Sequence, residues 1–207
     1  MKGHPVFARV YGVLGALAER GELGQRRRAL LARAEGTVVE VGAGTGENCK
    51  HYPGAVRRVL APEPDPTKLR QARKRAAASD VPVFLVAASG ERLPFPDGSA
   101  DTAVVTLVLC SVDDPAAALG ELRRVLRPGG KVLFLEHVRA ADARLARWQD
   151  RLAGAWSRLA GGCRPNRRTR AALEAAGFDL VEFEAFDLRP GIPLVYPHIQ
   201  GVAEAPS

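Results

Sequence analysis

The residues best suited to bind a ligand form a glycine turn, Glu40-Val41-Gly42-Ala43-Gly44-Thr45-Gly46. This turn ends a short β-branched run, Thr37 to Val41, that predicts a buried strand. In doubly wound folds, the turn after the first strand binds a nucleotide-like ligand. Gly42 permits a tight turn, and Gly44 has no side chain to block a ligand that lies against the backbone. We therefore expect ligand contacts from Glu40, Gly42, Ala43, Gly44, Thr45 and Gly46.

The spacing of the glycines distinguishes among nucleotide-like ligands. A dinucleotide fingerprint, G-x-G-x-x-G, needs glycine at position 47, where this chain has Glu47. That carboxylate would stand beside a pyrophosphate at the N-terminus of a helix that we predict to begin near Asn48. A phosphate-binding loop is excluded as well, because no Gly-Lys-Ser/Thr follows. The ligand should therefore lack phosphates.

Two later turns carry residues that could complete such a site. Glu63 and Pro64 follow the second predicted strand, where an acidic residue can accept hydrogen bonds from both hydroxyls of a ribose. The alternative for Glu63 is an ordinary solvated loop carboxylate. After the third predicted strand comes a polar turn suited to the edge of an adenine, formed by Ser89, Gly90 and Glu91.

A common sheet must hold these loops together. Four more strand-like runs follow the first, at 56–61, 83–88, 102–109 and 131–138, with helical patterns between several of them. Before the last of these runs, Asp114 is placed as a helix N-cap and Pro115 at the first helical position. Strands alternating with helices predict a parallel sheet with right-handed crossovers. The hairpin-like runs at 178–186 and 194–203 extend this to an α/β fold with a seven-stranded mixed sheet whose last strand is antiparallel.

The first 35 residues have the periodicity of helices. One face of the first predicted helix carries Phe7, Val10, Tyr11, Leu14 and Leu17. A second helical pattern runs from Leu23 to Ala34, after a break at Gly21. We expect residues 1–35 to form an N-terminal helical lid and residues 36–207 to form the ligand-binding domain.

Composition restricts the class of protein. The chain has 207 residues, of which 46% are hydrophobic, so it should fold as a globular protein with a sizeable core. Cys49, Cys110 and Cys163 lie far apart without a C-x-x-C pair, so their spacing predicts neither a metal site nor a disulfide framework. A cytoplasmic location is the expectation.

The longest charge-free apolar run, 102–112, is far shorter than the roughly 20 residues that span a bilayer, so no transmembrane helix is expected.

A basic stretch could bind RNA or an anionic membrane surface. It comprises Arg139, Arg144, Arg147, Arg151, Arg158, Arg164, Arg167, Arg168 and Arg170, in a chain of net charge +7. The aromatic residues within it are Trp148 and Trp156. Both lie on the apolar face of a predicted helix, so we expect them in the core rather than as stacking platforms for bases. We therefore favour a small-molecule partner over a nucleic acid.

In this order, the motifs resemble those of class I S-adenosylmethionine-dependent methyltransferases of the methyltransferase type 11 group. The resemblance covers about Leu30 to Ala203 and is carried by Glu40 to Gly46, Glu63 to Pro66, Ser89 to Asp97, and Glu121 to Lys131. Three further segments resemble a narrower branch near the ubiquinone and menaquinone enzymes, which includes thiol methyltransferases of animals. These segments are Gly46 to Pro53, Thr106 to Val112, and Leu135 to Val138. In those animal relatives a hydrophobic anchor precedes the domain, and we expect none here.

The resemblance implies a Rossmann-like three-layer α/β/α sandwich with S-adenosylmethionine as its cofactor. It adds Thr106 and Leu107 to the expected cofactor contacts. Residues 36–207 then become an S-adenosylmethionine-binding methyltransferase domain. Methyl transfer from a sulfonium is an in-line displacement, so positioning of the reactants matters most and no covalent nucleophile is needed. His137 and His198 are the weak candidates for a catalytic role, with a structural role as the alternative for each.

The acceptor implied by the resemblance is small and apolar, such as a thiol. One alternative is C- or N-methylation of a quinone precursor or a lipid amine. Another is a non-catalytic cofactor-binding protein or an RNA-associated protein that uses the arginine stretch. Product formation separates an enzyme from a binding protein, and a panel of acceptors separates the enzymes.

Overall fold

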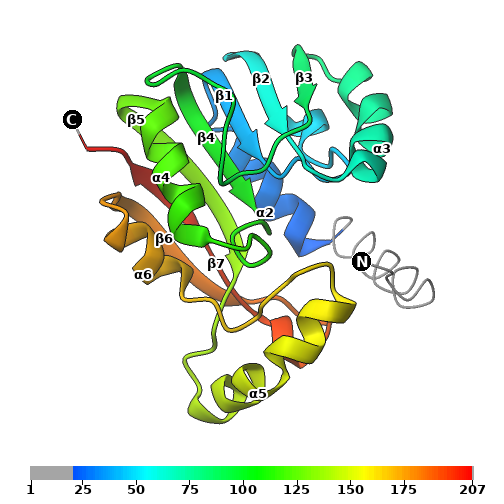
Figure 1. Cartoon of the computed structure of the whole chain (residues 1–207), viewed down its shortest axis with the longest axis vertical. Coiled ribbons are helices and arrows are strands. Elements are labelled where there is room, and N and C mark those ends of the chain that lie inside the picture. The colour runs from blue at the N-terminus through cyan, green and yellow to red at the C-terminus, as the bar shows by residue number, and fades with distance from the viewer. Residues whose placement is uncertain (1–20, 207) are drawn as a thin grey trace.

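The structure is a computed structural model that describes residues 21–206, built on a seven-stranded sheet of order β3-β2-β1-β4-β5-β7-β6 (Figure 1). The strands are β1 (Gly36–Val41), β2 (Val56–Pro62), β3 (Val83–Val86), β4 (Ala100–Thr106), β5 (Leu126–His137), β6 (Asp179–Asp187) and β7 (Pro197–Glu204). The first five pair in parallel, whereas β7 runs antiparallel to both β5 and β6. The expected mixed sheet with an antiparallel last strand is confirmed.

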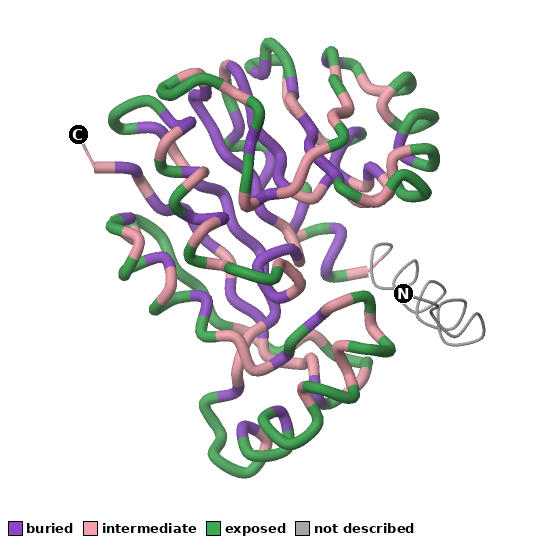
Figure 2. Tube along the Cα trace, in the orientation of Figure 1, coloured by how far each residue is buried: buried purple, intermediate pink, exposed green. Residues whose placement is uncertain are grey.

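Helices pack on both faces of this sheet. They are α2 (Glu22–Leu31), α3 (Pro66–Ala77), α4 (Pro115–Val125), α5 (Ala143–Leu159) and α6 (Thr169–Ala175). Successive residues of a strand point to opposite faces. Accordingly, Val38 belongs to the core that contains Leu31 of α2, and Val39 to the core that contains Leu122 of α4. The central strands are buried on both sides, which confirms the three-layer sandwich (Figure 2).

Aspartate caps start the two crossover helices. Asp114 accepts hydrogen bonds from the backbone N–H groups of Ala116 and Ala117, with Pro115 at the first helical position of α4, as expected. Asp65 caps α3 in the same way. Because α3 links β2 to β3, its cap fixes the turn that carries Glu63.

The helix expected near Asn48 does not form. The structure has instead a single 3₁₀ turn, η1 (Cys49–His51), after which Tyr52 is extended with ψ of 130°. Pro53 explains this ending, because the ring of a proline disfavours the helical region for the residue before it. The glycine turn therefore leads into an irregular segment, and no α-helix begins directly after it.

The expectation that Trp148 lies in the core is wrong. Its side chain is 57% exposed on α5, together with Leu152 and Leu159. Trp156 is partly buried, and its indole N–H donates to the Sγ of Cys163. The helical period locates the apolar side of α5, but the residues of α5 that are buried are Ala146 and Gln149. The spacing alone does not say which side of the helix another element covers.

Candidate active site

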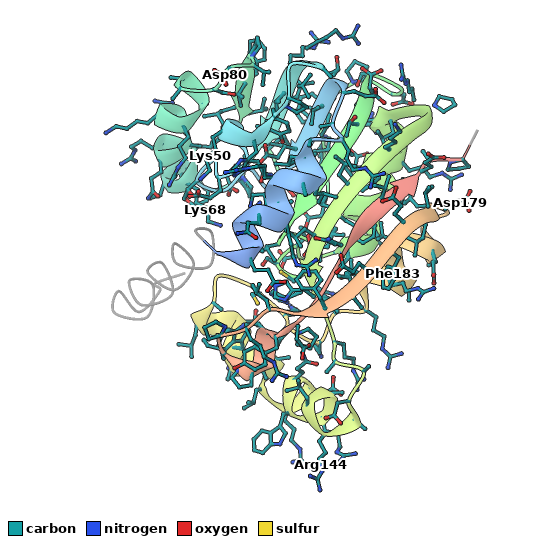
Figure 3. The ribbon with its side chains drawn as sticks, turned by 180° about the vertical axis from the view of Figure 1, so that it is seen from behind. Lys50, Lys68, Asp80, Arg144, Asp179 and Phe183 are labelled. Carbon is teal, nitrogen blue, oxygen red and sulfur yellow. The ribbon has the colours of Figure 1, made fainter. Side chains whose placement is uncertain are left out.

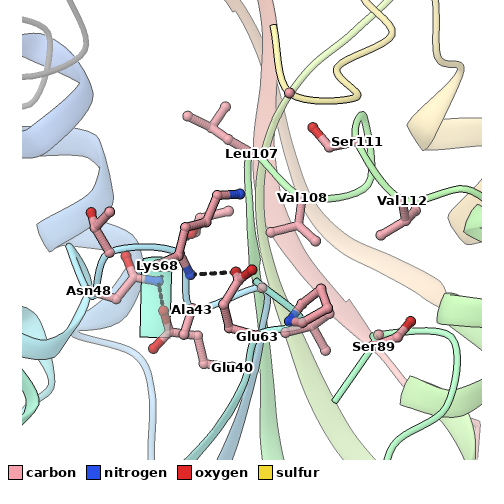
Figure 4. A pocket seen from close by; sticks show the side chains of 18 of the residues that line it. Glu40, Ala43, Asn48, Glu63, Lys68, Ser89, Leu107, Val108, Ser111 and Val112 are labelled. Atoms are coloured by element: carbon pink, nitrogen blue, oxygen red, sulfur yellow. Dashed lines mark hydrogen bonds between the residues drawn. The ribbon is translucent and has the colours of Figure 1, made fainter. Parts of the chain in front are cut away.

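A cavity of about 470 Å³ lies where β1, β2 and β4 end, between the glycine turn and the loop after β4. Its volume is in the range typical of sites for small ligands and cofactors. Figure 4 shows Glu40, Glu63 and Ser89 on its walls, with Leu107, Val108 and Val112 from the loop after β4. The carboxyl ends of parallel strands thus bring together segments more than 60 residues apart in the sequence.

Nearly all of the expected cofactor contacts line this cavity. They are Glu40, Gly42, Ala43, Gly44, Thr45, Glu63, Pro64, Ser89, Gly90, Glu91, Thr106 and Leu107. Gly46 is not among the lining residues. A Cβ at Gly46 would lie 3.3 Å from Ala72 of α3 and from the Sγ of Cys49, so this glycine allows close packing beneath the turn. Its contact with a cofactor stays a prediction, as do those of the others.

Gly44 shows that the turn is shaped as a cradle. Its φ is +56°, a left-handed conformation that glycine adopts without a steric penalty. A Cβ placed on Gly44 would meet no atom closer than the carbonyl oxygen of Gly42, at 3.8 Å. The space over this backbone is therefore free for a ligand, and a side chain there would fill it. This geometry fits the cofactor that the sequence implies.

The carboxylate of Glu63 is held in place on the cavity wall. Its two oxygens each accept a backbone hydrogen bond, one from Gly44 at 2.9 Å and one from Asp65 at 2.9 Å. The residue is only 3% exposed. A carboxylate has about four acceptor positions, so both oxygens can still accept hydrogen bonds from a ribose. Glu63 thus joins the glycine turn to the turn after β2 and remains available to a ligand.

Glu40 sits at the floor of the cavity in a buried polar network that sequence patterns did not reveal. It accepts hydrogen bonds from the hydroxyl of Tyr52 at 2.7 Å and from Nδ2 of Asn48 at 3.0 Å. Arg27, buried on α2, donates to Oδ1 of Asn48 at 2.5 Å and to Oγ1 of Thr106 at 2.9 Å. In the sequence, Arg27 is one of three consecutive arginines, and only the tertiary structure shows that it is the one buried at the cavity.

The pKa of Glu40 is raised to about 7, because burial disfavours its charged form more than Tyr52, Arg27 and Asn48 stabilise it. Between about pH 4.5 and 7, the Glu40 side chain is therefore protonated in the folded protein and ionised in the unfolded chain. We expect the free energy of unfolding to fall as pH rises through this window, by about 3 kcal/mol relative to Glu40→Gln. Urea unfolding of both proteins at several pH values measures this difference. Parallel pH dependences would contradict it.

Glu91 organises the third wall of the cavity. It accepts hydrogen bonds from Ser89 and from the backbone N–H of Asp113, the latter at 3.0 Å. Burial alone would raise its pKa, but the hydrogen bonds from Ser89 and the backbone outweigh that effect and hold the pKa below its ordinary value. Glu91 is thus an anion that joins the turn after β3 to the loop after β4.

Glu136, near the end of β5, anchors the loop that follows β4. That strand ends at Thr106, because Leu107 has φ of +61° and turns the chain out of the sheet. The fully buried carboxylate of Glu136 then accepts hydrogen bonds from the backbone of Val108 at 2.8 Å and Leu109 at 3.0 Å. Its pKa is raised by burial. The loop therefore presents Leu107 and Val108 to the cavity in a fixed conformation.

The two candidate histidines lie behind the cavity. His137 on β5 and His198 on β7 are register partners, and their rings meet edge to face with centroids 6.0 Å apart. Each is 5% exposed, and neither lines the cavity. The Nε2 atom of His137 is 3.1 Å from the Sγ of Cys163. A catalytic role for either histidine stays a prediction, without a contact to the cavity wall to support it.

The residues of the arginine stretch lie in different environments. Arg139 pairs with Asp150 at 2.7 Å, and Arg170 pairs with Glu174 at 2.9 Å. Arg167 donates to the backbone carbonyl of Val112, at 2.8 Å, and so supports the loop after β4. Figure 3 shows Arg144 at the end of the molecule opposite to Asp80. The stretch does not form one continuous wall of the cavity.

Comparisons with known proteins agree with this site. Residues 39–134 match the family model described as a methyltransferase domain. Human thiol S-methyltransferase TMT1A is 39% identical over 171 residues, which is 81% of this chain and 70% of that protein. Demethylmenaquinone methyltransferase of Thermus thermophilus is 35% identical over 134 residues, 61% of this chain and 60% of that protein.

The fold is shared with solved structures. A putative methyltransferase from Bacillus halodurans superposes with a TM-score of 0.72 at 18% identity, covering 88% of this chain and 98% of that one. Among the described residues, none of the helices is both long and apolar enough to cross a membrane. The family match, the identity to TMT1A and the glycine cradle agree. The chain belongs to the class I S-adenosylmethionine-dependent methyltransferases.

Proposed function

We propose that this enzyme transfers the methyl group of S-adenosylmethionine to the sulfur of a small, apolar thiol. The observation that carries the proposal is the identity to human thiol S-methyltransferases, 39% with TMT1A and 38% over 183 residues with TMT1B. The apolar loop after β4, with Leu107, Val108 and Val112 on the cavity wall, supports it. Such a wall suits an apolar acceptor better than a charged one.

The charge of the cavity supports the same choice. Its wall carries five acidic side chains, Glu40, Glu47, Glu63, Glu91 and Asp113, and two basic ones, Arg27 and Lys68. An excess of carboxylates attracts a sulfonium and an ammonium group and repels phosphates. This favours a cofactor with cationic groups and disfavours acceptors that are phosphorylated or made of nucleic acid.

In this mechanism the protein contributes binding, orientation and exclusion of water. S-adenosylmethionine, when bound, supplies a sulfonium-linked methyl group for in-line displacement. Glu63 would hold the ribose hydroxyls, and Gly44 would let the cofactor lie against the backbone. The loop fixed by Glu136 would confine the acceptor and so help to align its sulfur with the methyl group. Transfer would form a bond between the acceptor sulfur and the methyl carbon as the methyl–sulfonium bond breaks, and the thiol proton would pass to solvent.

An acceptor thiol explains why no strong base is needed. A free thiol has a pKa of about 8.5 and is partly ionised near neutral pH, and the thiolate is the nucleophile. We expect the rate with a small alkyl thiol to rise from about pH 6 to about pH 9 as the thiolate fraction grows. Salt should change the rate little, because binding of a small thiol does not depend on the arginine stretch.

Product analysis by mass spectrometry over an acceptor panel tests this proposal. The panel contains alkyl thiols, a demethylated quinone precursor, a lipid amine and RNA. A methyl thioether as the main product supports the thiol assignment. Methylation of the quinone precursor alone would replace that assignment and would agree with the similarity to the Thermus thermophilus enzyme. No product from any acceptor would overturn the thiol assignment as well.

We also propose that residues 1–35 act as a lid over the acceptor. Residues 1–20 lie outside the described part, so support comes from α2, whose Arg27 reaches the cavity wall. Deletion of residues 1–20 should lower kcat more than it weakens S-adenosylmethionine binding. Steady-state kinetics and calorimetry on the same preparations compare the two effects. Unchanged kinetics would restrict these residues to packing.

The three cysteines support a proposal about location. Cys49, Cys110 and Cys163 are all buried, and none of them forms a disulfide. Free, buried thiols persist best in a reducing compartment, so we propose the cytoplasm as the site of action.

A further inference from the structure

The fold brings together two cysteines and a histidine that are far apart in the sequence. Cys110 lies in the loop after β4, His137 ends β5, and Cys163 follows α5. One ligand atom of each lies within 4.8 Å of those of the other two. All three residues are buried. Their spacing in the chain matches no metal-binding motif, so the cluster exists only in the folded protein.

We propose that Cys110, His137 and Cys163 bind a zinc ion. Two thiolates and an imidazole are ligands that zinc prefers, and the cluster holds no carboxylate oxygen of the kind that magnesium or calcium needs. In a tetrahedral zinc site, such ligand atoms lie roughly 3.5–3.8 Å apart. The present separations, including 3.1 Å between His137 Nε2 and Cys163 Sγ, need only small side-chain shifts to reach that geometry.

The surroundings of Cys163 match those of a metal-bound thiolate. The indole N–H of Trp156 donates to the Sγ of Cys163 at 3.0 Å, and such outer hydrogen bonds orient and stabilise ligating sulfur. The Nδ1 atom of His137 has no hydrogen-bond partner among the described residues. The side-chain contacts of this imidazole with hydrogen-bonding atoms are therefore with Cys163 and Cys110, the two other members of the cluster.

The cluster lies next to the wall of the cavity. The Sγ of Cys110 is 3.4 Å from the hydroxyl of Ser111, and Ser111 lines the cavity. Gly161, two residues before Cys163, lines it as well. The cluster is therefore separated from the cavity by the residues of this wall. Three protein ligands leave a fourth position for water or another small ligand.

A bound ion would tie three separate elements together. The loop of Cys163 already contacts the loop after β4, because the N–H of Arg164 donates to the carbonyl oxygen of Cys110 at 2.7 Å. Zinc would add a bond from each loop to the end of β5. We therefore expect zinc to raise the melting temperature of the protein, because a ligand that binds only the folded state stabilises it.

Cobalt(II) titration of the full chain, after removal of metal with a chelator, tests the site directly. We expect about one equivalent of cobalt to give thiolate-to-cobalt charge-transfer bands and the intense visible bands of tetrahedral coordination, and zinc to abolish both. Elemental analysis of the purified protein should show about one zinc per chain. Absence of both signals in the wild-type protein would overturn the proposal, whatever the variants do.

Variants assign the ligands. Cys163→Ser should weaken zinc binding more than the roughly 10–100-fold typical of outer-shell changes and remove most of the charge-transfer intensity. Cys49→Ser is the matched control, because Cys49 is also a buried free thiol and is not part of the cluster. Equal spectra for both variants would contradict the assignment.

Detection of a Cys110–Cys163 disulfide in the unreduced protein, in place of metal, would also overturn it. These measurements are independent of methyl transfer, so they separate this site from the proposed acceptor.

Discussion

Gly44→Val should abolish S-adenosylmethionine binding. The φ of +56° at Gly44 directs a Cβ into the space over the turn, where the nearest atom is 3.8 Å away. A branched side chain would occupy the place of the ligand, and no neighbouring side chain can move aside to restore it. The left-handed backbone would add a steric cost, because β-branched residues rarely adopt it. Calorimetric titration with S-adenosylmethionine measures the loss.

A matched control separates these two effects. Gly98 has φ of +58° and no neighbour within 4 Å of a Cβ, and it does not line the cavity. Gly98→Val therefore carries the same backbone strain without blocking the ligand, and it should bind S-adenosylmethionine normally with a lowered melting temperature. Normal binding by Gly44→Val would mean that the glycine turn is only a structural connection.

Glu63→Ala should weaken S-adenosylmethionine binding by about a hundredfold or more. A charged acceptor that holds two ribose hydroxyls contributes about 1.5–3 kcal/mol through each hydrogen bond, and about 1.4 kcal/mol corresponds to a factor of ten. The same change removes the acceptor for the N–H groups of Gly44 and Asp65. A lowered melting temperature should therefore accompany the loss of affinity.

Glu63→Gln tests which of these contributions matters. The amide keeps the shape and one acceptor oxygen but loses the negative charge. We expect its affinity to lie between those of the wild-type protein and Glu63→Ala. An affinity for S-adenosylmethionine unchanged in both variants, measured on folded protein, would remove Glu63 from the site and leave it as a link between two turns.

The order and type of most elements could be predicted from the sequence. The β-branched run before the glycine turn forms a strand buried on both faces, so its hydrophobicity is nearly continuous and easy to recognise. Asp114 and Pro115 mark the start of α4 because capping acts within one helical turn. The same local logic failed at Asn48, because Pro53 limits a segment that has room for only one 3₁₀ turn.

The cavity walls were also predictable to a large extent. Glycines followed by acidic and polar turns lie at strand ends, and the carboxyl ends of parallel strands meet at one edge of a sheet. Chain order alone therefore indicates that Glu40, Gly44, Glu63 and Ser89 approach one another. It does not fix the hydrogen bonds that hold Glu63, since these need coordinates of both turns.

The sequence by itself determined the seven-stranded α/β fold, the glycine cradle and the resemblance to methyltransferases, because each depends on residues close together in the chain. Only the tertiary structure placed Arg27 beside Asn48 and joined Cys110, His137 and Cys163. It also left Trp148 exposed. The physical reason is that burial, buried hydrogen bonds and ligand clusters depend on how separate elements pack, and the spacing of residues along one chain does not record those distances.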